Sequence, residues 1–151
     1  MAKKFRGPEI VAEINDALDK GMARFLILTQ GKLSAGSPVD TGRMASSWFI
    51  GAGVPNRDVP PEQGTPSTYR NGVKVKQGTA GPIETSRPDF RITMDRDYFL
   101  SSNLPYSERV CFDPKWAKGG RRGGAAWFTS IATGLNKDAE KSFDFFLRKV
   151  K

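Results

Sequence analysis

Two stretches of helical periodicity, one near each end of the sequence, constrain the fold most. Apolar residues recur at steps of three and four over residues 8–33 and again over residues 125–150. Pro8 suits the first position of a helix, and the Gly-Ser-Pro sequence at 36–38 supplies a stop signal. Gly21 interrupts the first pattern as a weak spot. We therefore predict two long amphipathic helices, each with one buried face.

The sequence between these helices has the composition of a small sheet with long loops. Aromatic and aliphatic residues at 47–54, 90–94 and 98–102 predict three short strands, and we expect the last two to pair with the first. Six glycines and six prolines fall within residues 51–88, which predicts a long loop or arm. A hairpin is expected within it, at about residues 72–76.

The order of these elements predicts an α+β fold. Pro105 is expected to open a helical turn that carries Tyr106, Val110 and Cys111 before the last helix begins. A chain of 151 residues is long enough for one core. We therefore predict a single domain over residues 1–151, with a long N-terminal helix, a small antiparallel sheet with long loops, and a C-terminal helix.

Composition removes several classes of chemistry. The chain has no histidine and a single cysteine, which excludes the common zinc and iron ligand sets, an intramolecular disulfide and histidine-based catalysis. We therefore expect no metal, no cofactor and no enzymatic activity. The sequence has neither a long apolar run nor an apolar N-terminal signal region, so we expect a soluble protein that does not contact a membrane.

Positive charge gathers in the middle of the sequence. The formal net charge is +8, and the glycine-rich loop at 115–124 contributes Lys115, Lys118, Arg121 and Arg122. Such a loop can contact nucleic-acid phosphates, but it can equally be a solvated turn or a contact for an acidic protein surface. Trp116 and Trp127 flank the loop, and exposed tryptophans are common interface anchors. These six residues form the candidate subunit or partner interface, with a basic nucleic-acid-binding module as the alternative.

The tripeptide Asp40-Thr41-Gly42 is also found at the active site of aspartic proteases. In those enzymes two aspartates share one proton. They lie in rigid loops that follow buried strands, whereas here the tripeptide follows the predicted end of a helix and precedes the bulky Arg43. A protease that uses Asp40 is therefore a remote alternative. A structural corner explains the residues better, because Asp40 can cap the next turn and Gly42 can take a backbone angle that other residues resist.

The longer string from Val39 to Trp48 resembles the signature of bacteriophage tail-completion and neck proteins. This head–tail joining family includes the minor tail protein Z group. Its pattern is a long helix, then V-D-T-G-R-hydrophobic-x-x-S, then a strand, and it is matched at Val39, Asp40, Thr41, Gly42, Arg43, Met44 and Ser47. The segment Asn103-Leu104-Pro105-Tyr106 matches the family's N-x-P-Y element after a late strand, and a terminal helix closes the domain in both.

This resemblance implies a structural virion protein. It implies a ring, commonly of six subunits and alternatively of twelve, at the junction where a tail meets the portal-bearing head. The implied partners are further copies of the chain, portal, adaptor or head-closure proteins, and a tail terminator or tail tube. DNA would pass through the channel without sequence specificity. The protein would be present in the host cytoplasm during assembly and in the virion afterwards.

Two residues of the structural motif keep alternative interpretations. Arg43 is predicted either to bridge to an acidic group of a neighbouring subunit or to pair locally with Asp40 or a helix carboxylate. Tyr106 is predicted to be buried or half-buried, with an intersubunit contact as the alternative. The remaining motif residues are expected to be structural: Val39, Thr41, Gly42, Ser47, Asn103 and Pro105.

Overall fold

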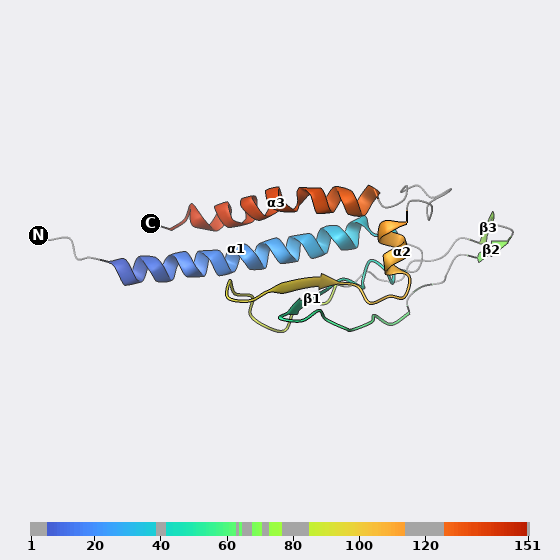
Figure 1. The fold of residues 1–151 in the computed structure, drawn as a ribbon, viewed down its shortest axis with the longest axis horizontal. Helices are drawn as coiled ribbons and strands as arrows, with labels where there is room; N and C mark the ends of the chain where they lie inside the picture. Colours follow the sequence, from blue (N-terminus) through green and yellow to red (C-terminus); the bar gives the residue numbers. More distant parts are fainter. Residues whose placement is uncertain are drawn as a thin grey trace, which may run out of the picture.

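The structure is a computed structural model that describes residues 6–38, 42–62, 64, 68–70, 73–76, 85–113 and 126–150. Within these residues the order of elements is α1 (Gly7–Gly36), β1 (Phe49–Ala52), β2 (Thr68–Arg70), β3 (Val73–Lys76), β4 (Tyr98–Ser101), α2 (Ser107–Phe112) and α3 (Ala126–Leu147) (Figure 1). The predicted α+β arrangement is confirmed: a long N-terminal helix, a C-terminal helix and a small antiparallel sheet. Among the helices described here, none is both long and apolar enough to span a membrane.

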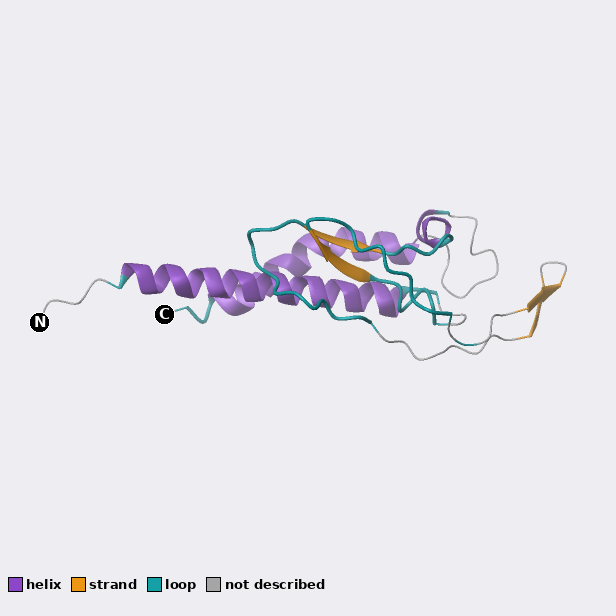
Figure 2. Cartoon of the chain, turned by 90° about the horizontal axis from the view of Figure 1, so that it is seen from below, coloured by secondary structure: helices purple, strands orange, loops and turns teal. Residues whose placement is uncertain are grey.

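Helices α1 and α3 lie side by side and run in opposite directions (Figures 1 and 2). Both correspond to the predicted helices within a few residues, and a proline occupies the first turn of α1. Helix α1 continues through Gly21, the position that the sequence marked as a weak spot. Gly21 is buried, and a Cβ built on it would lie 2.5 Å from Cδ1 of Phe143, so the glycine lets α3 approach closely.

Strands β1 and β4 form an antiparallel pair, as predicted for residues 47–54 and 98–102. The register places Ile50 opposite Leu100 and Gly51 opposite Phe99. Ile50 and Leu100 belong to a cluster with Leu26 of α1, so this face of the pair is directed to the helix. A Cβ on Gly51 would lie 2.3 Å from the carbonyl oxygen of Val54, so the following loop covers the opposite face at Gly51.

The predicted strand at residues 90–94 is wrong, because this segment forms no strand and lies as an irregular loop against α1. Ile92 still enters the core, but the backbone is satisfied by side chains instead of a strand partner. The Met94 amide donates to Asp19 of α1 over 2.9 Å, and the Thr93 amide donates to the Tyr98 hydroxyl over 2.7 Å. The alternating apolar pattern therefore identified the burial of Ile92 but not the backbone conformation.

Strands β2 and β3 form the hairpin expected within the Gly/Pro-rich segment. Thr68 is paired with Lys76 and Arg70 with Val73, with an irregularity in the register after Thr68. In the sequence the strands flank Asn71-Gly72, a dipeptide typical of tight hairpins. Figures 1 and 2 both place the two strands beyond the end of the α1/α3 pair, which agrees with the expected arm.

The core is concentrated around the C-terminal half of α1. One cluster joins the end of this helix to the chain before β1, to α2 and to the start of α3, and its buried members are Leu33, Met44, Trp48, Leu104, Val110 and Cys111. The predicted helical turn after Pro105 is confirmed as α2, and it contributes Val110 and Cys111 to this cluster. In the first ten residues of α1, by contrast, no side chain is buried.

Candidate functional site: the corner between α1 and β1

The structure describes the second half of the motif as a tight, buried turn. Residues 39–41 lie outside the described part of the chain, so the predicted roles of Val39, Asp40 and Thr41 stay predictions. Gly42 has a φ angle of 85°, which confirms that it takes a backbone angle disfavoured for other residues. The Ser46 amide then donates to the Gly42 carbonyl over 3.1 Å, which closes one turn.

Serine hydroxyls hold this corner to the rest of the domain. Ser47 Oγ donates to the Met44 carbonyl over 2.8 Å and lies 2.7 Å from the hydroxyl of Ser102, just after β4. Ser37 Oγ donates to the Leu33 carbonyl and accepts the indole N–H of Trp48 over 2.9 Å. The end of α1, the corner and the end of β4 are therefore joined by buried hydrogen bonds.

Gln30 is a residue of this site that the sequence analysis missed. It is 3% exposed, and its Nε2 donates to the Trp48 carbonyl over 2.7 Å and to the Ser86 carbonyl over 3.0 Å. A buried amide that bridges two backbone carbonyls fixes where the chain enters β1. The available signal was a polar residue on the sheet-facing side of α1, between the apolar Leu26 and Leu33.

Arg43 makes a contact that neither of its predicted interpretations included. Its Nε donates to the Pro60 carbonyl over 3.2 Å, which links the corner to the loop after β1. Asp40 lies outside the described residues, so the predicted local pair with it stays a prediction, as does the bridge to a neighbouring subunit.

The N-x-P-Y element also holds the loop after β1. Asn103 Nδ2 donates to the Asn56 carbonyl over 2.7 Å and to the Asp58 carbonyl over 3.0 Å, and the Ser101 hydroxyl also donates to Asn56. The two motifs that carry the family resemblance therefore both hold residues 56–60, although they are 55 or more residues apart in sequence. The asparagine has the structural role expected of it, and sequence alone did not show which loop it holds.

Tyr106 is not a core residue, because 39% of its surface is exposed. It lies just before the first turn of α2, and the core face of that helix is taken by Val110 and Cys111 one turn later. Pro105 beside it is also exposed. The interpretation of Tyr106 as an intersubunit contact stays a prediction.

Of the six residues of the predicted interface, only Trp127 lies within the described part of the chain. Its ring packs against the core cluster 6.4 Å from the ring of Trp48, and its indole N–H donates to the Val110 carbonyl over 3.4 Å. It therefore has an intramolecular packing role, and its interface role stays a prediction. The other five members lie outside the described residues: Lys115, Trp116, Lys118, Arg121 and Arg122. They include the four basic residues on which the nucleic-acid alternative depends, so that alternative also stays a prediction.

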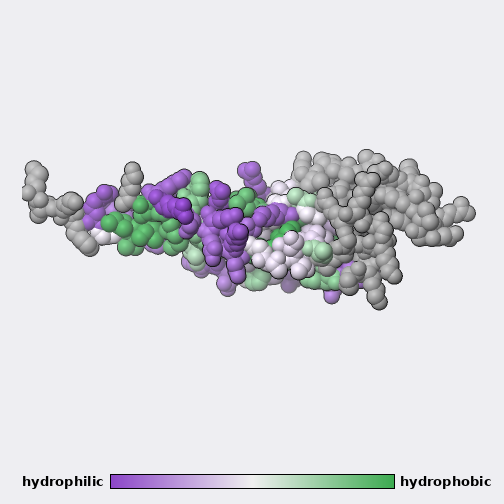
Figure 3. Space-filling view, turned by 90° about the horizontal axis from the view of Figure 1, so that it is seen from above, coloured by the Kyte–Doolittle hydropathy of each residue, from purple (hydrophilic) through white to green (hydrophobic). Residues whose placement is uncertain are grey.

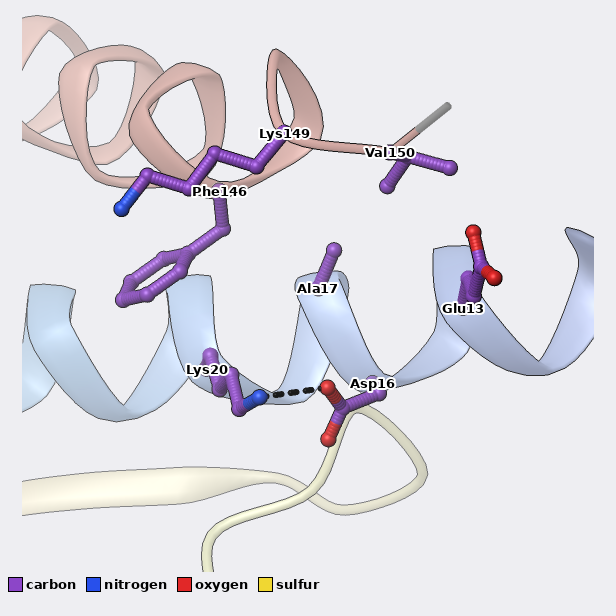
Figure 4. Close-up of a pocket in the computed structure, with 7 residues that line it drawn as sticks. All are labelled: Glu13, Asp16, Ala17, Lys20, Phe146, Lys149 and Val150. Carbon is purple, nitrogen blue, oxygen red and sulfur yellow. Dashed lines mark hydrogen bonds and ion pairs between the residues drawn. The ribbon is translucent and has the colours of Figure 1, made fainter.

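A second feature lies where α3 ends against α1. An open cavity of about 380 Å³ is lined by four charged and three apolar residues: Glu13, Asp16, Ala17, Lys20, Phe146, Lys149 and Val150 (Figure 4). Asp16 and Lys20 form an ion pair with each other over 2.6 Å. No group of three or more metal-ligating side chains occurs within the part of the chain that the structure describes. The cavity therefore marks the end of the contact between the two helices.

Comparison of the chain with protein-family models, with curated proteins and with solved structures gave no match.

Proposed function

We propose that this protein is a structural component of a tailed-phage virion that forms a ring at the head–tail junction. The supporting observation is the position of the two motifs in the fold. The V-D-T-G-R string connects the end of the long α1 helix to strand β1, and the N-x-P-Y segment connects β4 to α2. This is the order of elements in the family that the sequence resembles, and α3 follows as the terminal helix.

The architecture around the motifs is compatible with a building block. Buried hydroxyl and amide groups of the corner are used to hold backbone segments together, as the bonds of Ser37, Ser47 and Gln30 illustrate. A long helix pair and a hairpin that lies beyond it offer extended surfaces for neighbours (Figure 1). Subunits of a ring need two different surfaces, because head-to-tail contacts close a cycle.

Electron microscopy of particles made with and without the protein tests this proposal. A phage genome with the gene interrupted should give separate filled heads and free tails, and wild-type protein supplied in trans should restore joined particles. Normal joined particles in the absence of the protein would refute the proposal. Purified wild-type virions should also contain the chain in a small fixed copy number, as a ring requires.

Variants of Arg43 refine the same experiment. Arg43→Ala removes the donor to the Pro60 carbonyl and any intersubunit bridge, whereas Arg57→Ala removes an exposed arginine of the same loop region. If Arg43 contacts a neighbour, Arg43→Ala should reduce joined particles while its thermal unfolding stays close to that of Arg57→Ala. Equal yields of joined particles from the two variants would contradict an intersubunit role for Arg43.

A further inference from the structure

Helix α1 continues past the end of α3, and its apolar stripe continues with it (Figure 1). Ala17 and Gly21 are buried on the face of α1 that meets α3. Ile14 and Ile10 follow on this face at helical spacing and are 37% and 40% exposed, with Val11 beside them at 57%. Figure 3 shows apolar side chains gathered at this end of the molecule. We call Glu9, Ile10, Val11, Glu13 and Ile14 the overhang.

The overhang is apolar with an acidic border. Residues 6–19 contain four carboxylates and a single basic residue, Arg6, although the chain as a whole is strongly basic. Arg6 lies 2.5 Å from a carboxylate oxygen of Glu9 and 3.8 Å from one of Glu13, so one cation serves two exposed carboxylates. The stripe is continuous with the α1/α3 interface, so it has the composition of a helix contact but lacks a covering helix in the described part of the chain.

A surface of the opposite charge adjoins the overhang along the helix pair, and its Lys149 lines the same cavity as Glu13 of the overhang. Phe145 of α3 is 44% exposed, and two cations lie near its ring: Arg24 Cζ is 4.3 Å and Lys149 Nζ is 4.0 Å from its centroid. Ile27 and Leu28 are 45% and 46% exposed and lie three and four residues after Arg24, on the same side of α1. We call these five residues the cationic patch.

The two cations of the cationic patch have no carboxylate within ion-pair distance among the described residues. Arg24 and Lys149 therefore combine positive charge outside these ion pairs with an exposed aromatic ring and two exposed aliphatic side chains. A partner that is apolar and acidic suits this surface. The overhang has that composition.

We propose that the overhang of one copy of this chain packs on the cationic patch of the next copy. In this contact Ile10 and Ile14 would cover Phe145, Ile27 and Leu28, and Glu9 and Glu13 would meet Arg24 and Lys149. The proposal rests on the proposed function, since it supplies the ring with its head-to-tail contact. An overhang paired with a second overhang is disfavoured, because it would bring the same carboxylates against one another.

Charge reversal with rescue by mixing tests the contact in the full-length chain. The first variant, Glu9→Lys with Glu13→Lys, makes both surfaces basic, and the second, Arg24→Glu with Lys149→Glu, makes both acidic. Sedimentation velocity over a concentration series should show that each variant alone associates at least about tenfold more weakly than the wild type. An equimolar mixture should recover association, because each surface again meets its opposite. Circular dichroism melts check that both variants fold.

Two further variants separate local contact from general charge effects. Glu62→Lys with Glu108→Lys changes the net charge as the first variant does, at exposed carboxylates outside both surfaces, and should associate like the wild type. Ile10→Ser removes an apolar contact of the overhang from an already exposed position and should weaken association by about tenfold.

Three results would overturn the inference. These are a wild type that stays monomeric at every concentration, reversals that leave association unchanged, and a second variant that associates normally while the first does not. The last result would indicate contact between two overhangs. Each of these leaves the proposed virion role to be decided by the particle experiment, so failure of the contact and failure of the function are distinguishable.

Discussion

Gly21 lies at the contact between the two long helices, and its replacement by alanine tests how closely they pack. The added Cβ would lie 2.5 Å from Phe143 Cδ1 and 3.1 Å from Phe143 Cα, so either the ring or the α3 backbone must shift. Overpacking of this kind costs about 1–3 kcal/mol. Alanine also gains about 1 kcal/mol of helix propensity over glycine. The free energy of unfolding should therefore fall by roughly 0–2 kcal/mol.

Gly31 on the same helix provides the matched control. It is exposed, and a Cβ built there has nothing within 4 Å, so Gly31→Ala keeps the propensity gain without the clash. The difference between the two variants isolates the overpacking term, about 1–3 kcal/mol, because the propensity terms cancel. Urea unfolding followed by circular dichroism at 222 nm measures both. In thermal melts the difference should be about 3 °C per kcal/mol for a chain of this length.

A double mutant tests whether the Phe143 ring causes the loss of stability in Gly21→Ala. In a Phe143→Ala background the ring is gone, so Gly21→Ala should cost less than it does in the wild type, and the double mutant should lose less stability than the two single variants lose together. If Gly21→Ala stabilises the protein as much as Gly31→Ala does, α3 does not approach α1 closely enough for a Cβ at position 21 to meet Phe143.

Three further predictions concern the sheet, the corner and the thiol. Gly51→Ala should destabilise the fold by about 2 kcal/mol or more, because its Cβ would meet backbone atoms of residues 54–56 at 2.3 and 2.6 Å; an unchanged urea midpoint would contradict this. Gln30→Met should cost about 1–3 kcal/mol by leaving the Trp48 carbonyl without its donor, and unchanged stability would show that the bridge is dispensable. Burial raises the pKa of Cys111 from 9.0 to about 11, so the folded state holds this proton more tightly. Its contribution to stability should be complete below pH 9 and should be lost as the pH rises towards 11. Cys111→Val should remove that part of the alkaline loss, and an identical pH profile for variant and wild type would refute the assignment.

The long helices and the β1/β4 pair could be predicted from sequence because their signals are local. Apolar residues at steps of three and four mark the buried stripe of a helix wherever its partner lies, and Pro8 and the stop after residue 36 set the ends of α1. The segment at 90–94 shows the limit of this reasoning. Ile92 and Phe90 do join the core, but the amides of Met94 and Thr93 donate to Asp19 and Tyr98 in place of a strand, and no local pattern encodes those partners.

In the candidate site, too, some features follow from local sequence and others depend on distant partners. The sequence by itself determined that Gly42 occupies a backbone conformation that favours glycine, and that a corner follows the first helix. Only the tertiary structure decided that Asn103 holds the loop after β1, that Gln30 supports the corner and that Gly21 is a contact point. The physical reason is that backbone preferences depend on a residue and its neighbours in the chain. A hydrogen-bond partner or a steric contact depends on atoms brought together from segments tens of residues apart.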